Sequence, residues 1–466
     1  MTIDSLRPCC RARTAILAIA IALAPVASAA ETLADTLTTA YRNSNLLEQN
    51  RAVLRAADED VAQAIAALRP TLDFILNTST TTVTTPNSPS NGFFEDFSST
   101  MSLVSQIVLF EGGRLRNDRE LAKETVLATR DQLKVIEQNV LLNAVDAFFD
   151  VLSAEAFVSV REDNVRLIGE ELQAARDRFE VGEVTRTDVA LAESRLAAAR
   201  SQLAAARGDL DVAEEVFRTA VGRYPGDLQR PATLPATAPT EDAARDIAVR
   251  RHPSIQQAQR EVTVAELAID SARAGFGPTI SANLRGDLDD DGGDSAAFSL
   301  QFSQRLYSGG NIPSLVREAA ARRDQSRANL HQTTLGIAEN VGTAWATVAV
   351  AQAQIVATAQ QVRAAQIAFE GTREEARLGA RTTLDVLDAE QDLLDARADQ
   401  IDAVSQQNIA VYSLLSAMGL LTVEHLQLGV QTYDPVAYYN AVDGAPARHS
   451  KQGQALDRVL RRLDRQ

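Results

Sequence analysis

Side chains that could do chemistry are few in this sequence, and none has the spacing of a reactive site. The four histidines share no metal-ligand spacing; they are His252, His331, His425 and His449. The acidic run 287–292 resembles the start of a calcium-binding loop, but Phe298 stands where such a loop needs a glutamate. No catalytic triad and no glycine-rich phosphate loop is evident. We therefore expect no enzyme activity, no cofactor and no metal site.

Two threonine–aspartate pairs have the spacing of a capping box, which starts a helix. Thr185 lies three residues before Asp188, and Thr382 lies three residues before Asp385. Asp388 follows after three more residues, so Asp385 and Asp388 would share one helix face. Two interpretations of Asp385 are open, a helix cap or a functional carboxylate, whereas Asp388 has no capping role at this spacing.

Residues 1–30 have the features of an export signal. Basic residues precede an apolar run from Ala15 to Ala24, which is too short to span a bilayer, and Ala27-Ser28-Ala29 matches a cleavage site. Cleavage after Ala29 or Ala30 would remove both cysteines, so we expect a mature chain without a disulfide, a zinc site or a reactive thiol. An uncleaved membrane anchor is the alternative.

Charge and hydropathy narrow the class of protein further. The net charge of −16 makes nucleic acid a poor partner for an exported chain. No segment after the signal offers about 18 consecutive apolar residues, the length of a membrane-spanning helix. The protein should therefore be soluble after export, or enter an outer membrane as a β-barrel.

The second half of the sequence repeats the first. The segment 110–113 recurs at 307–310, and 181–189 recurs at the same shift at 378–386. The residues around Pro70 and Pro278 also match, with extra residues in the first half that fit a longer loop around 86–89. Several matches in the same order indicate a duplication.

Each half predicts a helix, two strands and two long helices. The stretches 114–180 and 314–378 contain no proline and have apolar residues at spacings of three and four. Each would be on the order of 100 Å long as a helix, which indicates coiled-coil-like packing. We predict repeat one at 31–222 and repeat two at 241–419.

The four predicted strands have one apolar and one polar face. They cover 71–81, 98–110, 279–288 and 297–306, each long enough to cross a bilayer as a tilted strand. A half-buried soluble sheet would alternate equally well. In lipid, four strands cannot close a wide barrel and an open edge is not tolerated, so several chains would have to combine.

This plan resembles the TolC family of outer-membrane efflux and secretion proteins, over about residues 33–428. The duplication, the double glycines after the strands and the stretch 382–389 carry the resemblance. It implies an α+β membrane protein in the outer membrane of a Gram-negative bacterium. Three identical chains would form a twelve-stranded barrel in lipid and a helical periplasmic tunnel. It also implies a periplasmic adaptor and an inner-membrane pump of the ABC or RND type.

The resemblance also implies roles for residues near the two helix connections. Asp385 and Asp388 match aspartates that line the periplasmic entrance and bind cations. Arg381 matches an arginine that latches the entrance shut, and Thr187 with Asp188 match its acceptors. The family's latch tyrosine corresponds to Ala376, so we expect a weaker or rearranged latch. The alternative is that Arg381 only lies on a solvated turn.

The remaining segments are expected to surround the tunnel. Residues 223–240 form a proline-rich connection, and 420–466 form an equatorial segment with a mobile tail, although a short amphipathic helix fits the tail equally well. The predicted function is a passive exit duct for type I protein secretion or multidrug efflux. A secreted soluble coiled-coil scaffold without a pore is the alternative. The lack of a lipid-anchor cysteine mildly favours the protein-secreting branch.

Overall fold

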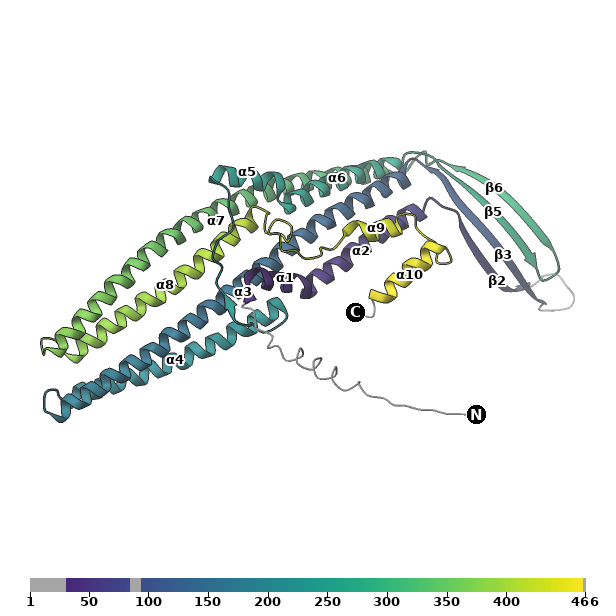
Figure 1. Ribbon diagram of the computed structural model, residues 1–466. Helices are drawn as coiled ribbons and strands as arrows, with labels where there is room; N and C mark the ends of the chain where they lie inside the picture. The colour runs from purple at the N-terminus through teal and green to yellow at the C-terminus, as the bar shows by residue number, and fades with distance from the viewer. Residues whose placement is uncertain (1–30, 84–93, 464–466) are drawn as a thin grey trace, which may run out of the picture.

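The computed structural model describes residues 31–83 and 94–463, which form one elongated molecule (Figure 1). A four-stranded sheet lies at one end, and two helical hairpins extend to the other end. The predicted export signal and the loop expected around 86–89 lie outside the described residues.

Both halves have the same order of elements, as the internal repeat predicts. The first half contains α1 (Leu33–Asn43), α2 (Asn45–Ala66), β2 (Thr71–Val83), β3 (Phe94–Glu111), α3 (Arg114–Glu180) and α4 (Arg186–Val221). The second half contains α5 (Glu241–Arg251), α6 (Pro253–Ala274), β5 (Thr279–Asp289), β6 (Asp294–Ser303), α7 (Asn311–Arg377) and α8 (Thr383–Ala417). The remaining elements are β1 (Glu31–Thr32), β4 (Leu228–Gln229), α9 (Pro435–Val442) and α10 (Lys451–Leu463).

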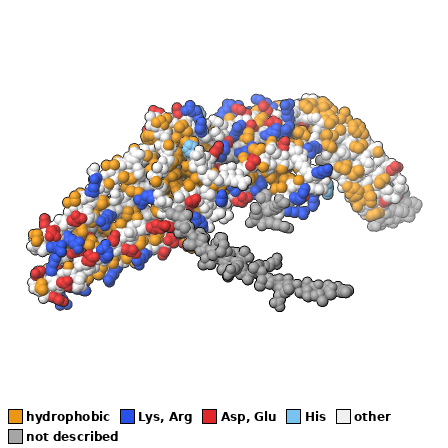
Figure 2. Space-filling view, in the orientation of Figure 1, with side chains coloured by type: hydrophobic (Ala, Val, Ile, Leu, Met, Phe, Trp, Pro, Cys, Tyr) orange, Lys and Arg blue, Asp and Glu red, His pale blue; other side chains and the backbone are white. Residues whose placement is uncertain are grey.

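The main sheet is antiparallel in the order β2-β3-β5-β6, so the two halves join at the β3–β5 ladder. The register aligns apolar residues across the strands: Leu76 lies opposite Met101, which lies opposite Leu288. The same face carries large side chains that are more than half exposed, namely Leu72, Phe74, Leu284, Phe298, Leu300 and Phe302. Figure 2 shows hydrophobic side chains gathered over this end, whereas charged ones spread over the hairpins.

The opposite face of the sheet is polar and internally hydrogen-bonded. Ser102 donates to Asp287 at 2.6 Å, and Arg285 donates to the same carboxylate at 2.7 Å. The sheet therefore has the two chemically distinct faces that the alternation predicts.

The strand bounds differ in detail from the sequence prediction. β3 begins at Phe94, before the predicted residue 98, and β6 covers 294–303, where 297–306 was predicted. Pairing sets the bounds of β6, because its ladder with β5 ends at the Thr279–Ser303 pair. Residues 304–306 have no partner in β5, and Gln304 interrupts the apolar positions 298, 300 and 302.

The long helices match the prediction closely. α3 has the predicted bounds, and α7 starts three residues before the predicted 314 because Pro313 lies in its first turn, where proline costs no hydrogen bond. Among the described residues, α7 alone has a length and composition that would suit a membrane crossing. Helices of this length and composition also pack against other helices, as α7 does against α6 and α8.

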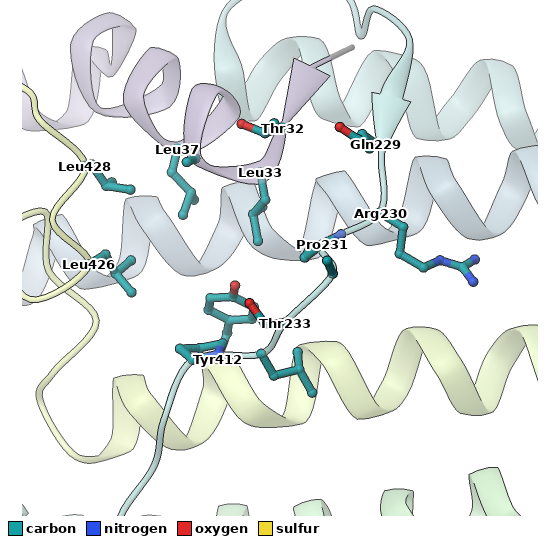
Figure 3. A pocket seen from close by; sticks show the side chains of 14 residues that line it. Thr32, Leu33, Leu37, Gln229, Arg230, Pro231, Thr233, Tyr412, Leu426 and Leu428 are labelled. Carbon is teal, nitrogen blue, oxygen red and sulfur yellow. The ribbon is translucent and has the colours of Figure 1, made fainter.

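The main core lies where α1, the middle of α3, the end of α4 and the end of α8 pack together, a region that we call the belt. Its largest buried side chains include Leu37, Leu141, Phe148, Phe217, Leu415 and Leu421. Strand β1 pairs in parallel with β4, which ties the start of the described chain to the proline-rich connection. Beside this contact lies a pocket of about 510 Å³, into which Leu33, Leu37 and Tyr412 point (Figure 3).

The C-terminal segment runs along the outside of this belt toward the sheet (Figure 1). Arg69, at the end of the first helical segment, donates to the carbonyls of Gly444 and Ala445 at 2.7 and 2.9 Å. Of the two expectations for the tail, the structure contains the short helix, α10.

Double glycines join the sheet to the long helices. Gly112 and Gly309 occupy matching positions with φ of +60° and +61°. A Cβ on Gly112 would collide with the carbonyl of Ala274, and Gly277 also passes close, because a Cβ there would lie 2.7 Å from the Gly112 Cα. Gly309 has no atom within 4 Å of the same position. Within the single chain, a close crossing of the two halves therefore occurs at the first junction, whereas the second junction follows the free edge strand β6.

This asymmetry predicts different costs for the same substitution. In the unassembled chain, Gly309→Ala should lower the free energy of unfolding by about 1–2 kcal/mol, because an L residue is strained at positive φ. Gly112→Ala has the same strain and an additional backbone collision, so its loss should be clearly larger. Thermal unfolding followed by circular dichroism measures both. Equal losses would show that the close approach at Gly112 is unimportant.

Candidate functional site at the tips of the helical hairpins

The predicted site residues lie at the end of the molecule farthest from the sheet. The α3–α4 hairpin turns at residues 181–185, and the α7–α8 hairpin turns at 378–382. Figure 1 shows the two tips next to each other at the end opposite the strands. The duplicated motifs therefore form two equivalent turns.

Each turn closes its first helix with a glycine in the left-handed region. Gly182 has φ of +80° and Gly379 has φ of +78°. The following amides donate back to the helices, from Glu183 to the carbonyl of Arg178 and from Ala380 to that of Glu375, both at 2.9 Å. This is the Schellman type of helix end, which satisfies carbonyls that the helix leaves free.

Both predicted capping boxes are present at the starts of α4 and α8. The Asp385 carboxylate accepts from the amide and hydroxyl of Thr382 at 2.9 and 2.8 Å, and Asp188 accepts from Thr185 in the same way. The backbone and side-chain hydrogen bonds from Thr382, aided by the charge of Arg381, lower the pKa of Asp385. Asp385 therefore has a structural role whatever else it does.

Asp388 makes a contact that sequence reasoning missed. Arg195 on α4 donates to its carboxylate at 2.9 Å and so links the first hairpin to the second. Both side chains are well exposed, at 39% for Arg195 and 58% for Asp388. The pair lies on different repeats far apart in sequence, so no local pattern indicates it.

Arg381 binds within its own hairpin in the single chain. Its Nε donates to Glu375 at 2.9 Å. The predicted acceptor Thr187 is exposed, and Asp188 is partly buried. Asp188 and Arg381 line the same cleft of about 510 Å³ between the two tips, but no hydrogen bond joins them in the described chain. Ala376, at the position of the latch tyrosine, is buried beside Phe369 and Val386.

The two hairpins meet along a region that we call the seam, where α3 packs against α8. Near the tips, Leu387 of α8 packs into a cluster formed by residues of α3 and α4, including Ile168, Leu172 and Leu196. Further up, the Asn164 amide donates to buried Glu390 at 2.9 Å, and Arg373 pairs with Glu171 at 3.0 Å. A glutamate within the buried stripe of α8 was the available sequence signal for this contact.

Within the described chain, no group of three or more His, Cys, Asp or Glu side chains could hold a metal ion. His252, one of the four histidines, is buried and caps α6 through an amide hydrogen bond from Ser254 to its Nδ1 at 3.2 Å. Burial lowers the pKa of this imidazole. His252 therefore has a structural role.

Comparison with known proteins places the chain among outer-membrane channels. The sequence profile of the outer membrane efflux protein family matches residues 36–223 and 244–420. Outer membrane efflux protein BepC of Brucella suis is 31% identical over 439 residues, covering 92% of this chain and 94% of BepC. Proteases secretion protein PrtF of Dickeya chrysanthemi is 26% identical, covering 82% and 87%. The Campylobacter jejuni CmeC outer membrane channel has the same fold, with a TM-score of 0.75, 16% identity and coverage of 89% and 90%.

Asp385 caps α8, whereas Asp388 pairs with Arg195, so substituting them should have different effects. Asp385→Ala should speed amide exchange in the first turn of α8 several-fold, because it removes the acceptor for the Thr382 amide. Asp388→Ala should leave this turn unchanged. Since the pKa of Asp385 is lowered, its contribution should persist at neutral pH and disappear only as pH falls through that lowered value.

Hydrogen exchange with mass spectrometry measures both variants, and Asp188→Ala is the matched control in the first hairpin. It should affect only the start of α4. A first turn of α8 that exchanges equally in the Asp385→Ala and Asp388→Ala variants would contradict the assigned capping role.

Proposed function

Because the chain belongs to the outer membrane efflux protein family, we propose that three copies of it form one passive duct through the outer membrane and into the periplasm. The protein is an outer-membrane exit channel and not an enzyme. The observation that carries the proposed assembly is the sheet, which has one apolar face and two free edges.

The edges of the sheet support assembly. β2 and β6 each pair with one neighbour only in the order β2-β3-β5-β6. Lipid cannot satisfy the free amides and carbonyls of such an edge, so β2 of one copy should pair with β6 of the next. Three copies of four strands would close a twelve-stranded wall with its apolar face toward lipid.

The helices support the same assembly. α7 leaves large apolar side chains more than half exposed, namely Leu335, Val350, Val356 and Ile367. On the other hairpin, α3 and α4 form a groove of about 610 Å³ that includes Phe157, Val212 and Val216. We propose that α7 of one copy packs against this groove of the next, which would bury both apolar surfaces.

The tips would then surround the periplasmic entrance. We propose that Asp385 and Asp388 form a ring of six carboxylates under three-fold symmetry, which would attract cations. We also propose that Arg381 closes the entrance by binding Thr187 and Asp188. The shared cleft that Asp188 and Arg381 line supports this pairing. Glu375, which binds Arg381 in the single chain, would compete for the same guanidinium.

The partners would be a periplasmic adaptor at the tips and an inner-membrane pump that supplies the energy. The name of BepC includes efflux and that of PrtF includes protease secretion. We therefore propose that the channel takes part in type I protein secretion or in multidrug efflux. The polar, hydrogen-bonded face of the sheet would line the path. The soluble scaffold is disfavoured because it would leave the apolar face of the sheet in water.

A charge on each face of β6 tests the assembly. Phe298→Arg places a cation on the apolar face, which costs about 2–4 kcal/mol near the middle of a bilayer. It should sharply reduce the yield of membrane-inserted trimers. Ser299→Arg, on the adjacent residue of the polar face, is the matched control and should assemble normally. Native electrophoresis of outer-membrane extracts measures the trimers, and equal yields would contradict a lipid-facing apolar surface.

The latch is tested by single-channel conductance in planar bilayers. Arg381→Ala should raise the conductance of the resting channel, because it removes the donor that holds the entrance. Glu375→Gln should lower it or leave it low, because Arg381 would lose its competing partner. An unchanged resting conductance in Arg381→Ala would remove Arg381 from the latch.

The Asp388→Ala variant belongs in the same measurement, where it should weaken block by divalent cations added on the periplasmic side.

A further inference from the structure

The seam contains a carboxyl group that neither the proposed latch nor the acidic ring uses. Glu390 is 3% exposed, and its only hydrogen bond in the described chain comes from the Asn164 amide to Oε1 at 2.9 Å. Its Oε2 is buried without a partner. An ionised carboxylate left in this state would be costly, whereas a protonated one would be tolerated.

The charged groups around Glu390 come from three helices. α3 contributes Glu171, Asp163 and Arg166, α7 contributes Arg373, and α8 contributes Arg397. Arg373 is already paired with Glu171, and Arg166 pairs with Asp163 and Glu170. Arg397 donates to Gln366 at 3.0 Å. No cation in the described chain forms an ion pair with Glu390.

The contact joins the two repeats, since Asn164 belongs to α3 and Glu390 to α8. A polar cavity of about 210 Å³ lies beside it, lined also by Asp163, Arg166, Gln366 and Arg397. If the hairpins separate, water can reach Glu390 from this cavity. Its carboxylate would then lose the penalty that burial imposes.

We propose that buried Glu390 is a proton-dependent fastening where the two hairpins meet: the hairpins stay packed while Glu390 is protonated and loosen when Glu390 ionises. Glu390 is a positioning residue in this proposal, since it acts on the separation of the hairpins and touches no cargo. The inference rests on the proposed duct, because separation of the hairpins would widen its entrance.

The sign of the pH dependence follows from the surroundings. Burial, and then repulsion by Glu171, raise the pKa of Glu390 from 4.5 to about 7, against the opposing effects of the Asn164 hydrogen bond and Arg373. Separated hairpins would return the pKa to its ordinary value. Packed hairpins then bind more protons between about pH 4.5 and 7, so their packing weakens as the pH rises through this window and changes no further above it.

The separation of the tips can be measured directly on full-length assembled protein. Spin labels at Val184→Cys and Ala380→Cys report the distance between the two turns, and conductance in planar bilayers reports the entrance. Both should increase from pH 5 to pH 8, with a shift in the packing equilibrium of at most on the order of 100-fold per chain. Glu390→Gln, which is permanently neutral, should stay packed at pH 8. Asp392→Asn, an exposed carboxylate two residues later on α8, should titrate like the unmodified protein.

Two further variants should shift the pH midpoint of hairpin separation in opposite directions. A purely structural role of Glu390 would produce no such shifts. Asn164→Leu should move the midpoint to higher pH, because it removes a hydrogen bond that favours the ionised form. Glu171→Gln should move it to lower pH, because it removes a repelling charge. Infrared titration of the protonated carboxyl band in the unmodified protein gives the same midpoint without any substitution at Glu390.

A tip distance that does not change between pH 5 and 8 would overturn the proposal, as would a Glu390→Gln variant that titrates normally. These outcomes differ from a failure of the duct itself. A protein that forms no conducting channel at any pH would contradict the proposed function, whereas a conducting channel without pH dependence would contradict only the fastening.

Discussion

The open edges of a half-apolar sheet are the constraint on which the rest of the structure depends. A single chain supplies four strands with one face suited to lipid, but it leaves β2 and β6 without outer partners. Because a bilayer offers no hydrogen bonds, the chain is complete only among copies of itself. The exposed apolar residues of α7 fit the same requirement, because in the proposed assembly a neighbouring copy would cover them.

The tunnel and the sheet are coupled through the junctions where strands become helices. At Gly112 the two halves approach so closely that a side chain has no room. The equivalent Gly309 follows the free edge strand β6 and has no neighbour within the single chain. The duplicated halves differ in sequence at the tips, where two equivalent turns carry different charges and only the second has Arg381 and Asp388.

Sequence reasoning predicted the features that depend on local pattern. The bounds of α3, the alternating strand faces and both capping boxes follow from periodicity and from side chains that bond to their own backbone. It missed the Arg195–Asp388 and Asn164–Glu390 contacts, because each joins residues about two hundred positions apart. It also misplaced the end of β6, which is decided by the length of the β5 partner.

The equal lengths of α3 and α7, 67 residues each, have a consequence for how such a chain can change. Deleting one residue from either helix would retract its tip by about 1.5 Å and turn it by about 100° about the helix axis. Val386, Leu387 and Glu390 would then face residues that do not fit them, and the two turns would no longer lie level. We therefore expect length changes to be accommodated in the strand loops, where the two halves differ in length, and not within α3 or α7, which must stay equally long.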